Sequence, residues 1–301
     1  MSSTTGGAGA VYDRGYRPYE GPRGGRRAAT LALYRASIRR ALGLRRSWRQ
    51  KVAPFVLLGI VTIPAIVNVG IAYVTRDRIG NPIEFITYRE YVGVSSTLLV
   101  FVALTAPDII CPDRRQRVLP LLFARPLTGA DYVMAKVGAI FSVLFAFSFL
   151  PQVVLFVGQT LVSDSAIDYV RDNAEVLWKV PLAVVVLAGF YAVVGVAIAS
   201  LASRRIVAGA GFIGLFLVSS ITSAILTSDP ESVDRTGSLG ALVNVLALPI
   251  YLRDLIFLGH VDPESPLTGV AGGGLLAVTA YLVVAAVAAA VLLYRYRWTE
   301  R

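Results

Sequence analysis

The chain of 301 residues is 55% hydrophobic and only 16% charged, and its mean hydropathy is +0.65. Soluble domains average about 25% charged residues, so this composition excludes an ordinary soluble fold and indicates a protein of the bilayer. The net charge of +10 resides in residues 1–51, which hold twelve basic and two acidic side chains, whereas the remainder is neutral. Confinement of the charge to one segment argues against nucleic-acid binding.

The N-terminal region divides into two parts. Residues 1–25 are rich in Gly and Arg and lack hydrophobic periodicity, which predicts a flexible cytoplasmic tail. Residues 26–51 place apolar side chains on one side at helical spacing and most arginines elsewhere, which predicts a basic amphipathic helix at the cytoplasmic interface. We expect Arg35, Arg39 and Trp48 to be its interfacial residues. Anchoring on anionic lipid headgroups is the simpler role, and contact with a soluble partner is compatible with it.

Six apolar runs are long enough to cross a bilayer, which needs roughly 20 helical residues. They predict an all-α polytopic membrane protein with a transmembrane domain over residues 52–301. No short apolar core with a cleavage site precedes the first run, so we expect that run to act as a signal anchor. The predicted spans cover residues 52–74, 91–111, 137–161, 180–202, 206–227 and 269–294.

The apolar segment 239–258 is ambiguous because it also carries Pro249, Arg253 and Asp254. Six crossings with both termini in the cytoplasm put 22 basic residues inside and seven outside, as the positive-inside rule favours. A seventh crossing would carry the C-terminal arginines to the outside. We therefore expect two short helices, broken at Pro249, that re-enter the outer leaflet without crossing it.

The loop 112–136 combines several arginines with the apolar run 118–123. Pro112 and Asp113 can begin a short helix. Thr128 followed by Asp131 resembles a capping box that starts the next membrane helix while it is still in the cytosol. A short amphipathic helix between two rigid spans suits a contact that transmits force, and an interfacial linker is the simpler alternative.

Polar residues within the predicted spans are few. Asp108 is a candidate functional carboxylate, because a carboxylate at mid-bilayer costs about 2.5–3.5 kcal/mol. Its position near the inner end of the second span favours pairing with the neighbouring arginines, with a place in a transport path as the alternative. Gln152 and Gln159 are expected to bond to adjacent helices, and Gly269 with Gly273 forms a G-x-x-x-G pair that weakly indicates close helix contact.

Catalytic and cofactor motifs are missing from the sequence. The only lysines are Lys51, Lys136 and Lys179, and none lies in a phosphate-binding loop. The single Cys111 and single His260 exclude a disulfide framework and argue against a protein-only metal cage, and neither a nucleophile elbow nor an H-E-x-x-H motif occurs. We therefore expect no catalytic, cofactor-binding or metal-binding residues and no enzymatic activity in this chain.

Three features are shared with a known family. The first is the motif at Tyr12–Arg23, which reads YDRGYRPYEGPR, and the second is the motif at Ala106–Lys136, which reads APDIICPDRRQRVLPLLFARPLTGADYVMAK. The third is the layout of six spans with a long outer loop before the last span. Together they resemble bacterial ABC transporter permeases of the type-2, exporter-like class. The resemblance in layout covers nearly the whole chain, and the two motifs are more specific than the number of spans.

The resemblance implies a subunit of the cell membrane that pairs with a second copy or a paralogue and with separate ATPase subunits, in which ATP and Mg²⁺ bind. In such permeases the N-terminal helix and the loop after the second span form the ATPase interface. Here these are residues 26–51 and 113–127, and segment 239–258 corresponds to a re-entrant lid over the translocation path. Membrane lipids are further expected partners. The best individual candidates for the ATPase interface are Arg114, Arg115, Arg117, Arg125 and Pro126.

The expected function is therefore that of an exporter permease that couples ATP hydrolysis in a partner to substrate translocation. A membrane anchor or sensor scaffold that recruits a soluble partner without transport is the alternative. Co-purification with an ATP-hydrolysing partner would favour the permease. A lipid-modifying enzyme would need a cluster of polar catalytic residues at one interface, and the sequence has none. The sequence does not identify the transported substrate. It is compatible with a homodimer and with a heterodimer.

Overall fold

Six long helices account for the six apolar runs of the sequence. The computed structural model describes residues 24–44, 48–79, 87–92, 95–116, 118–124, 126–227 and 239–297. Six candidate membrane spans lie in this part of the chain, and it contains no strand, so the prediction of an all-α multi-pass membrane protein is confirmed. The long helices are α2 (Trp48–Ile79), α4 (Ser95–Arg115), α6 (Gly129–Val162), α8 (Val176–Leu201), α9 (Arg205–Thr227) and α12 (Gly273–Arg297).

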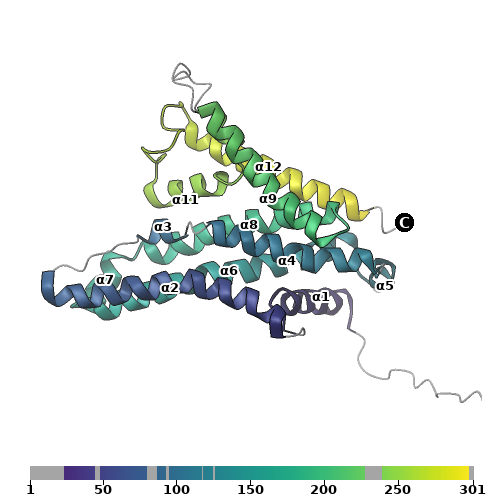
Figure 1. Ribbon diagram of the computed structural model, residues 1–301, viewed down its shortest axis with the longest axis horizontal. Coiled ribbons are helices and arrows are strands. Elements are labelled where there is room, and N and C mark those ends of the chain that lie inside the picture. Colours follow the sequence, from purple (N-terminus) through teal and green to yellow (C-terminus); the bar gives the residue numbers. More distant parts are fainter. Residues whose placement is uncertain are drawn as a thin grey trace, which may run out of the picture.

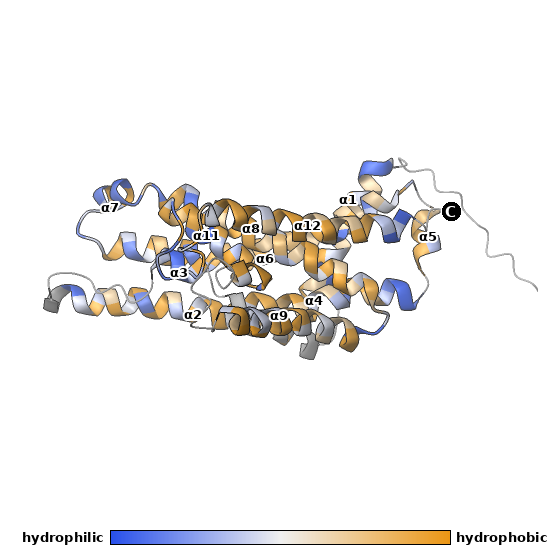
Figure 2. Ribbon diagram, turned by 90° about the horizontal axis from the view of Figure 1, so that it is seen from above, coloured by the Kyte–Doolittle hydropathy of each residue, from blue (hydrophilic) through white to orange (hydrophobic). Residues whose placement is uncertain are grey.

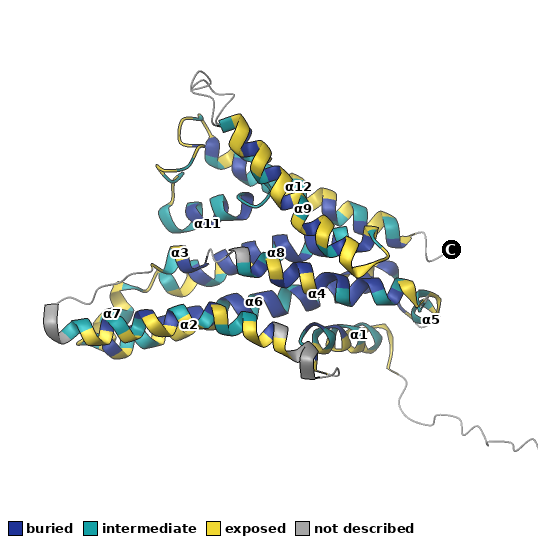
Figure 3. Ribbon diagram, in the orientation of Figure 1, coloured by how far each residue is buried: buried dark blue, intermediate teal, exposed yellow. Residues whose placement is uncertain are grey.

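Shorter helices cover the ends of the bundle, and α8 occupies its centre. Helix α8 packs against α6, α4, α12, α9 and α11, and most of its side chains are buried (Figure 3). Helix α2 lies along α6, while α9 and α12 cross the other side of the bundle obliquely (Figure 1). The shorter elements are α1 (Arg26–Ala41), α3 (Tyr88–Val92), α5 (Leu119–Phe123), α7 (Ala166–Asp172), the 3₁₀ turn η2 (Ala241–Val243) and α11 (Leu248–Leu258).

Two glycines allow the central helices to approach closely. A Cβ at Gly195 of α8 would overlap the side chain of Val102 in α4. A Cβ at Gly209 of α9 would lie 2.9 Å from the backbone oxygen of Ala103, also in α4. Because small residues let membrane helices pack with their backbones close together, these positions set the spacing of α4 from α8 and α9.

The middle of the bundle is apolar and its two ends are polar (Figure 2). We call the end that carries α5 the α5 end, and the end that carries α7 the α7 end. Helix α1 and the last turn of α12 both lie at the α5 end (Figure 1). The chain between them therefore crosses the bundle an even number of times, as six spans require.

The predicted helix over residues 26–51 is interrupted. Helix α1 ends at Ala41, Gly43 adopts a φ of 65°, and the Leu44 amide donates to the Arg39 carbonyl at 2.9 Å. A glycine with positive φ just after the last helical turn is a common way to end a helix. The expectation that Trp48 belongs to the interfacial helix was wrong, because Trp48 is the first residue of α2.

Two expectations near the last span also need correction. Pro249 lies in the first turn of α11, where proline is well tolerated, and the break between the two short helical elements falls at residues 244–247. Gly269 lies in a turn before α12, so Gly269 and Gly273 do not form a pair on one helix face. Close helix contacts at glycines occur instead at Gly195 and Gly209, which both approach α4.

Candidate functional site

A buried carboxylate joins three helices at the α5 end. Asp113, in the last turn of α4, accepts from Arg40 of α1 at 2.8 Å and from the Tyr132 hydroxyl of α6 at 3.1 Å. Its second ion pair is with Lys136 of α6, whose Nζ lies 2.6 Å from Asp113 Oδ2. Lys136 also donates to the Ile109 carbonyl of α4 at 3.2 Å. One carboxylate thus holds α1, α4 and α6 together, and we call Arg40, Asp113, Tyr132 and Lys136 the Asp113 cluster.

The predicted start of a short helix at Pro112 and Asp113 was wrong. Both residues continue α4 to Arg115, and the following helix is α5, which begins at Leu119. A proline in the last turn of α4 is tolerated because neighbouring groups can satisfy the carbonyl it leaves unbonded. The consequence is that Asp113 belongs to a buried helix end, where it is 4% exposed, and not to a mobile loop.

A second ion pair fixes α1 to the start of α6. Arg26 donates to both carboxylate oxygens of Asp131, at 2.6 and 3.0 Å. The Thr128 amide donates to Asp131 at 3.0 Å and the Asp131 amide donates to the Thr128 hydroxyl at 3.3 Å, which confirms the predicted capping box. The Tyr34 and Ser142 hydroxyls, 2.7 Å apart, add a third contact between the two helices. Helix α1 is therefore packed on the bundle along its length.

The predicted candidates Arg114 and Asp108 join α4 to α8 and α9. Arg114 donates to the carbonyls of Ser200 and Ala202, the latter at 3.1 Å, and so satisfies carbonyls that the end of α8 leaves unbonded. Asp108 pairs with Arg205 at the start of α9. The expectation of an ion pair for Asp108 is met, but its partner comes from a different helix than the expected neighbouring arginines.

Helix α5 has one attached face and one exposed face. Leu119, Leu122 and Phe123 pack against the core, and the Phe123 ring lies 6.2 Å from the Tyr132 ring of the Asp113 cluster. Leu121 is 71% exposed on the opposite side. A large apolar side chain displayed next to charged residues at a polar end is typical of an interaction surface.

The remaining predicted residues fall around these elements. Arg115 and Pro126 are exposed on either side of α5, and Arg35 and Arg39 are exposed on α1. Arg117, Arg125 and the side chain of Trp48 lie outside the part of the chain that the structure describes, as do residues 1–23 of the predicted tail.

An ion network at the α7 end was not predicted from the sequence. Arg89 of α3 pairs with Asp254 of α11 at 3.0 Å and with Asp262 in the following loop. Arg253 pairs with its neighbour Asp254 at 2.7 Å. In the sequence, Arg253 and Asp254 were considered only as residues that disfavour membrane insertion. Their opposite charges at adjacent positions could have predicted that they form an ion pair.

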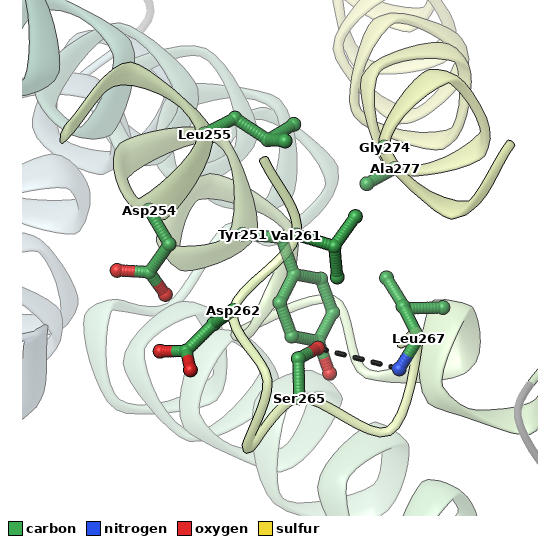
Figure 4. A pocket seen from close by; sticks show the side chains of 9 residues that line it. All are labelled: Tyr251, Asp254, Leu255, Val261, Asp262, Ser265, Leu267, Gly274 and Ala277. Carbon is green, nitrogen blue, oxygen red and sulfur yellow. Dashed lines mark hydrogen bonds between the residues drawn. The ribbon is translucent and has the colours of Figure 1, made fainter. Parts of the chain in front are cut away.

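A small pocket adjoins this network (Figure 4). Its space for water-sized groups is about 10 Å³, which suits about one water molecule. Asp254 and Asp262 lie on one side of it and Tyr251 lies beside Ser265, whose hydroxyl accepts from the Leu267 amide at 3.3 Å. The two carboxylates already face two arginines, so the local charge is balanced.

The pKa of Asp262 is held below its usual range. The backbone N–H of Glu264, 3.0 Å from Asp262 Oδ1, is the largest stabilising contribution to the carboxylate, and the positive charge of Arg89 adds to it. Asp262 therefore carries its negative charge throughout the physiological pH range and keeps the loop after α11 attached to α3.

Within the described ranges, no group of three or more His, Cys, Asp or Glu side chains could hold a metal ion. His260 is exposed and its Nδ1 lies 2.9 Å from the Val261 oxygen, while Cys111 is buried near the end of α8. Gln152 of α6 donates to the Tyr88 carbonyl of α3 at 3.4 Å, which confirms its predicted bond to a neighbouring helix, and Gln159 is buried.

No protein-family model matches the sequence, and no curated protein matches it.

Proposed function

We propose that this chain is the permease subunit of an ATP-driven ABC transporter of the exporter-like class, located in the cell membrane with its α5 end in the cytoplasm. The observation that carries the proposal is α5 itself. It is a short helix between two spans, attached to α6 on one face and exposing Leu121 on the other, with Arg115 and Pro126 on either side. The predicted abundance of basic residues on the cytoplasmic side supports this orientation.

The attachments of α5 would let a partner move the bundle. A displacement of α5 is transmitted to α6 through Phe123 and Tyr132, and Asp113 connects α6 to α4 and α1. Arg114 and the Asp108–Arg205 pair continue the connection to α8 and α9. Binding of ATP and Mg²⁺ in the partner subunits would then bias two arrangements of these packed helices, open to one side of the membrane or the other.

Two further subunit roles belong to the same proposal. A second copy or a paralogue completes the translocation path, and the re-entrant segment 239–258 covers that path at the α7 end. The packing of α11 against α8, α12 and α3 supports this placement, because short helices at membrane depth need surrounding protein.

The experiment compares ATP hydrolysis that co-purifies with the tagged chain. A double variant, Arg115→Glu with Leu121→Glu, changes the exposed face of α5 without touching Arg114, which bonds the end of α8. We expect this variant to insert into the membrane and to melt at the same temperature as the wild type. The Mg-ATPase activity that co-purifies with it should be at least about tenfold lower, since an interface residue of this kind contributes more than about 1.4 kcal/mol to the binding free energy.

The matched control is Arg171→Glu with Ile167→Glu on α7. Ile167 is 81% exposed and Arg171 is exposed, so the pair makes the same chemical change on a short helix at the opposite end. The control should retain the ATPase activity. Equal activity in both double variants would refute an ATPase interface at α5, and a co-purifying partner that hydrolyses no ATP would favour the scaffold instead.

A further inference from the structure

A pocket of about 610 Å³ opens at the α5 end, between the ends of α4, α8 and α12. Its size falls in the range of about 300–1,000 Å³ that is typical of ligand sites. It is separate from the exposed face of α5, because the residue that α5 contributes is the attached Leu119 and not Leu121. The residues that decide its chemistry are Arg114, Leu119, Leu201, Val291, Tyr294 and Arg295.

The pocket is positively charged. Arg114 and Arg295 both line it, and no carboxylate of the described residues pairs with either of them. Asp113, next to Arg114 in the chain, has its charge matched by Arg40 and Lys136. The bonds from Arg114 to the end of α8 hold its guanidinium in place at the pocket. The lining thus carries two positive charges, of which that of Arg114 is held in place, and no negative one.

The remaining lining is apolar and lies where the helices end. Leu201, the last residue of α8, is 58% exposed, and Val291 lies one to two turns before the end of α12. Along α12, Tyr294 lies between Val291 and Arg295, near the end of the helix, where a tyrosine is common at a membrane interface. The pocket therefore places aliphatic side chains beside two guanidinium groups, which complements a molecule with an anionic head and apolar chains.

We propose that this pocket binds an anionic phospholipid from the leaflet at the α5 end. The phosphodiester oxygens accept hydrogen bonds from Arg295 and Arg114, and an acyl chain lies along Leu201 and Val291. Basic pockets between membrane helices at the cytoplasmic side are suited to such headgroups, and two guanidinium groups can bind phosphate oxygens in a fixed geometry. Because the lipid contacts α4 and α12 together, its presence links the ends of these two helices next to α5. This site requires neither an ATPase nor transport, so it stands apart from the proposed function.

The test is native mass spectrometry of the full chain in mild detergent, titrated with phosphatidylglycerol and, separately, with phosphatidylcholine. We expect one phosphatidylglycerol to bind with a preference of at least about fivefold, because one basic side chain near a headgroup contributes roughly this factor. Arg295→Gln should weaken phosphatidylglycerol binding about fivefold and phosphatidylcholine binding by a smaller factor, because the choline cation offsets the attraction of its phosphate to Arg295. Arg295 is the residue of choice because, unlike Arg114, it does not bond the end of α8.

The matched control is Arg297→Gln, which removes the same charge two residues away, outside the pocket lining. It should weaken binding by less than about twofold. A second variant, Val291→Trp, fills the apolar part of the pocket without changing its charge and should reduce the binding of both lipids, with its melting temperature measured to confirm folding.

Equal effects of Arg295→Gln and Arg297→Gln would overturn the proposal, since the attraction would then be that of the whole basic surface. Displacement of the lipid by glycerol phosphate at equal concentration would also overturn it, because the apolar wall would then contribute nothing. The measurement contains no ATPase, so its failure leaves the proposed permease function intact, and loss of the permease function leaves this site intact.

Discussion

The Asp113 cluster permits a quantitative prediction, because the same substitution can be made in a buried and in an exposed ion pair. In Asp113→Asn, Lys136 loses its counter-ion while its side chain stays 3% exposed, and Arg40 loses its partner as well. Removing one member of a buried ion pair typically costs about 3–5 kcal/mol of unfolding free energy. We expect a destabilisation in that range.

The magnitude follows from the geometry of the pair. Two unit charges separated by 2.6 Å attract by about 6 kcal/mol at an effective dielectric constant near 20. Several kcal/mol per ion of lost hydration offset this attraction, so the intact pair contributes little net stability. In Asp113→Asn the attraction disappears and the cost of burying Lys136 remains. Asp113→Asn with Lys136→Met should therefore be more stable than Asp113→Asn alone, by about 2 kcal/mol.

The assay uses the only thiol of the protein as a reporter. Cys111 is buried, so a maleimide dye that fluoresces on reaction with a thiol reports the opening of the helix end that carries Asp113. Denaturant titrations in detergent micelles with this readout give unfolding free energies. The control is Asp164→Asn, because Asp164 pairs with Arg76 while 89% exposed and should cost at most about 1 kcal/mol.

Similar costs for Asp113→Asn and Asp164→Asn would refute the reasoning, because burial would then make no difference. Additive effects in the double variant would refute the direct coupling of Asp113 to Lys136. A larger cost for Arg40→Gln than for Asp113→Asn would contradict the assignment of Lys136 as the main partner, since Arg40 is 35% exposed.

Two further predictions concern other parts of the bundle. Gly209→Ala should destabilise by about 1–3 kcal/mol, because its Cβ would meet the Ala103 backbone oxygen, whereas Gly214→Ala in the same helix meets open space and should not destabilise; equal melting temperatures would contradict the close approach of α9 to α4. The lowered pKa of Asp262 predicts stability that is fully present above the unfolded value of about 3.9 and is lost as the pH falls through the folded pKa. Wild type and Asp262→Asn should therefore differ in melting temperature at pH 6 and converge at lower pH, and a constant difference down to pH 3 would exclude this linkage.

The six spans were predictable because each depends on a local property. A run of about 20 apolar residues has few alternatives to a membrane helix, and the capping box at Thr128 and Asp131 is formed within four residues. The end of α1 at Gly43 was also local, but the apolar periodicity continues through it, and the prediction followed the periodicity. Pro249 was read as a break although proline equally suits the first turn of a helix.

The candidate site could be predicted only in part because its contacts join distant residues. Arg40 and Asp113 are 73 residues apart, and Arg114 reaches carbonyls 86 and 88 residues away. Charge at the α5 end was visible in the sequence, but nothing local distinguishes Arg114, which bonds the end of α8, from Arg115, which is exposed. The spacing of α4 and α9 depends likewise on which glycine meets a backbone, and Gly209 and Gly214 look alike in the sequence.

Helix α6 has a consequence for the membrane itself. Its 34 residues extend over about 50 Å, whereas the hydrocarbon core of a bilayer is about 30 Å thick. Tilt alone would have to exceed about 50°, beyond the usual range of about 0–40°. Part of α6 therefore projects, and the polar first turns around Asp131 and Lys136 project at the α5 end. The remaining part of α6 is still longer than the hydrocarbon core of the bilayer, which is a hydrophobic mismatch. A change in the acyl-chain length of the lipids would therefore change the tilt of α6 and of the helices that are bonded to it.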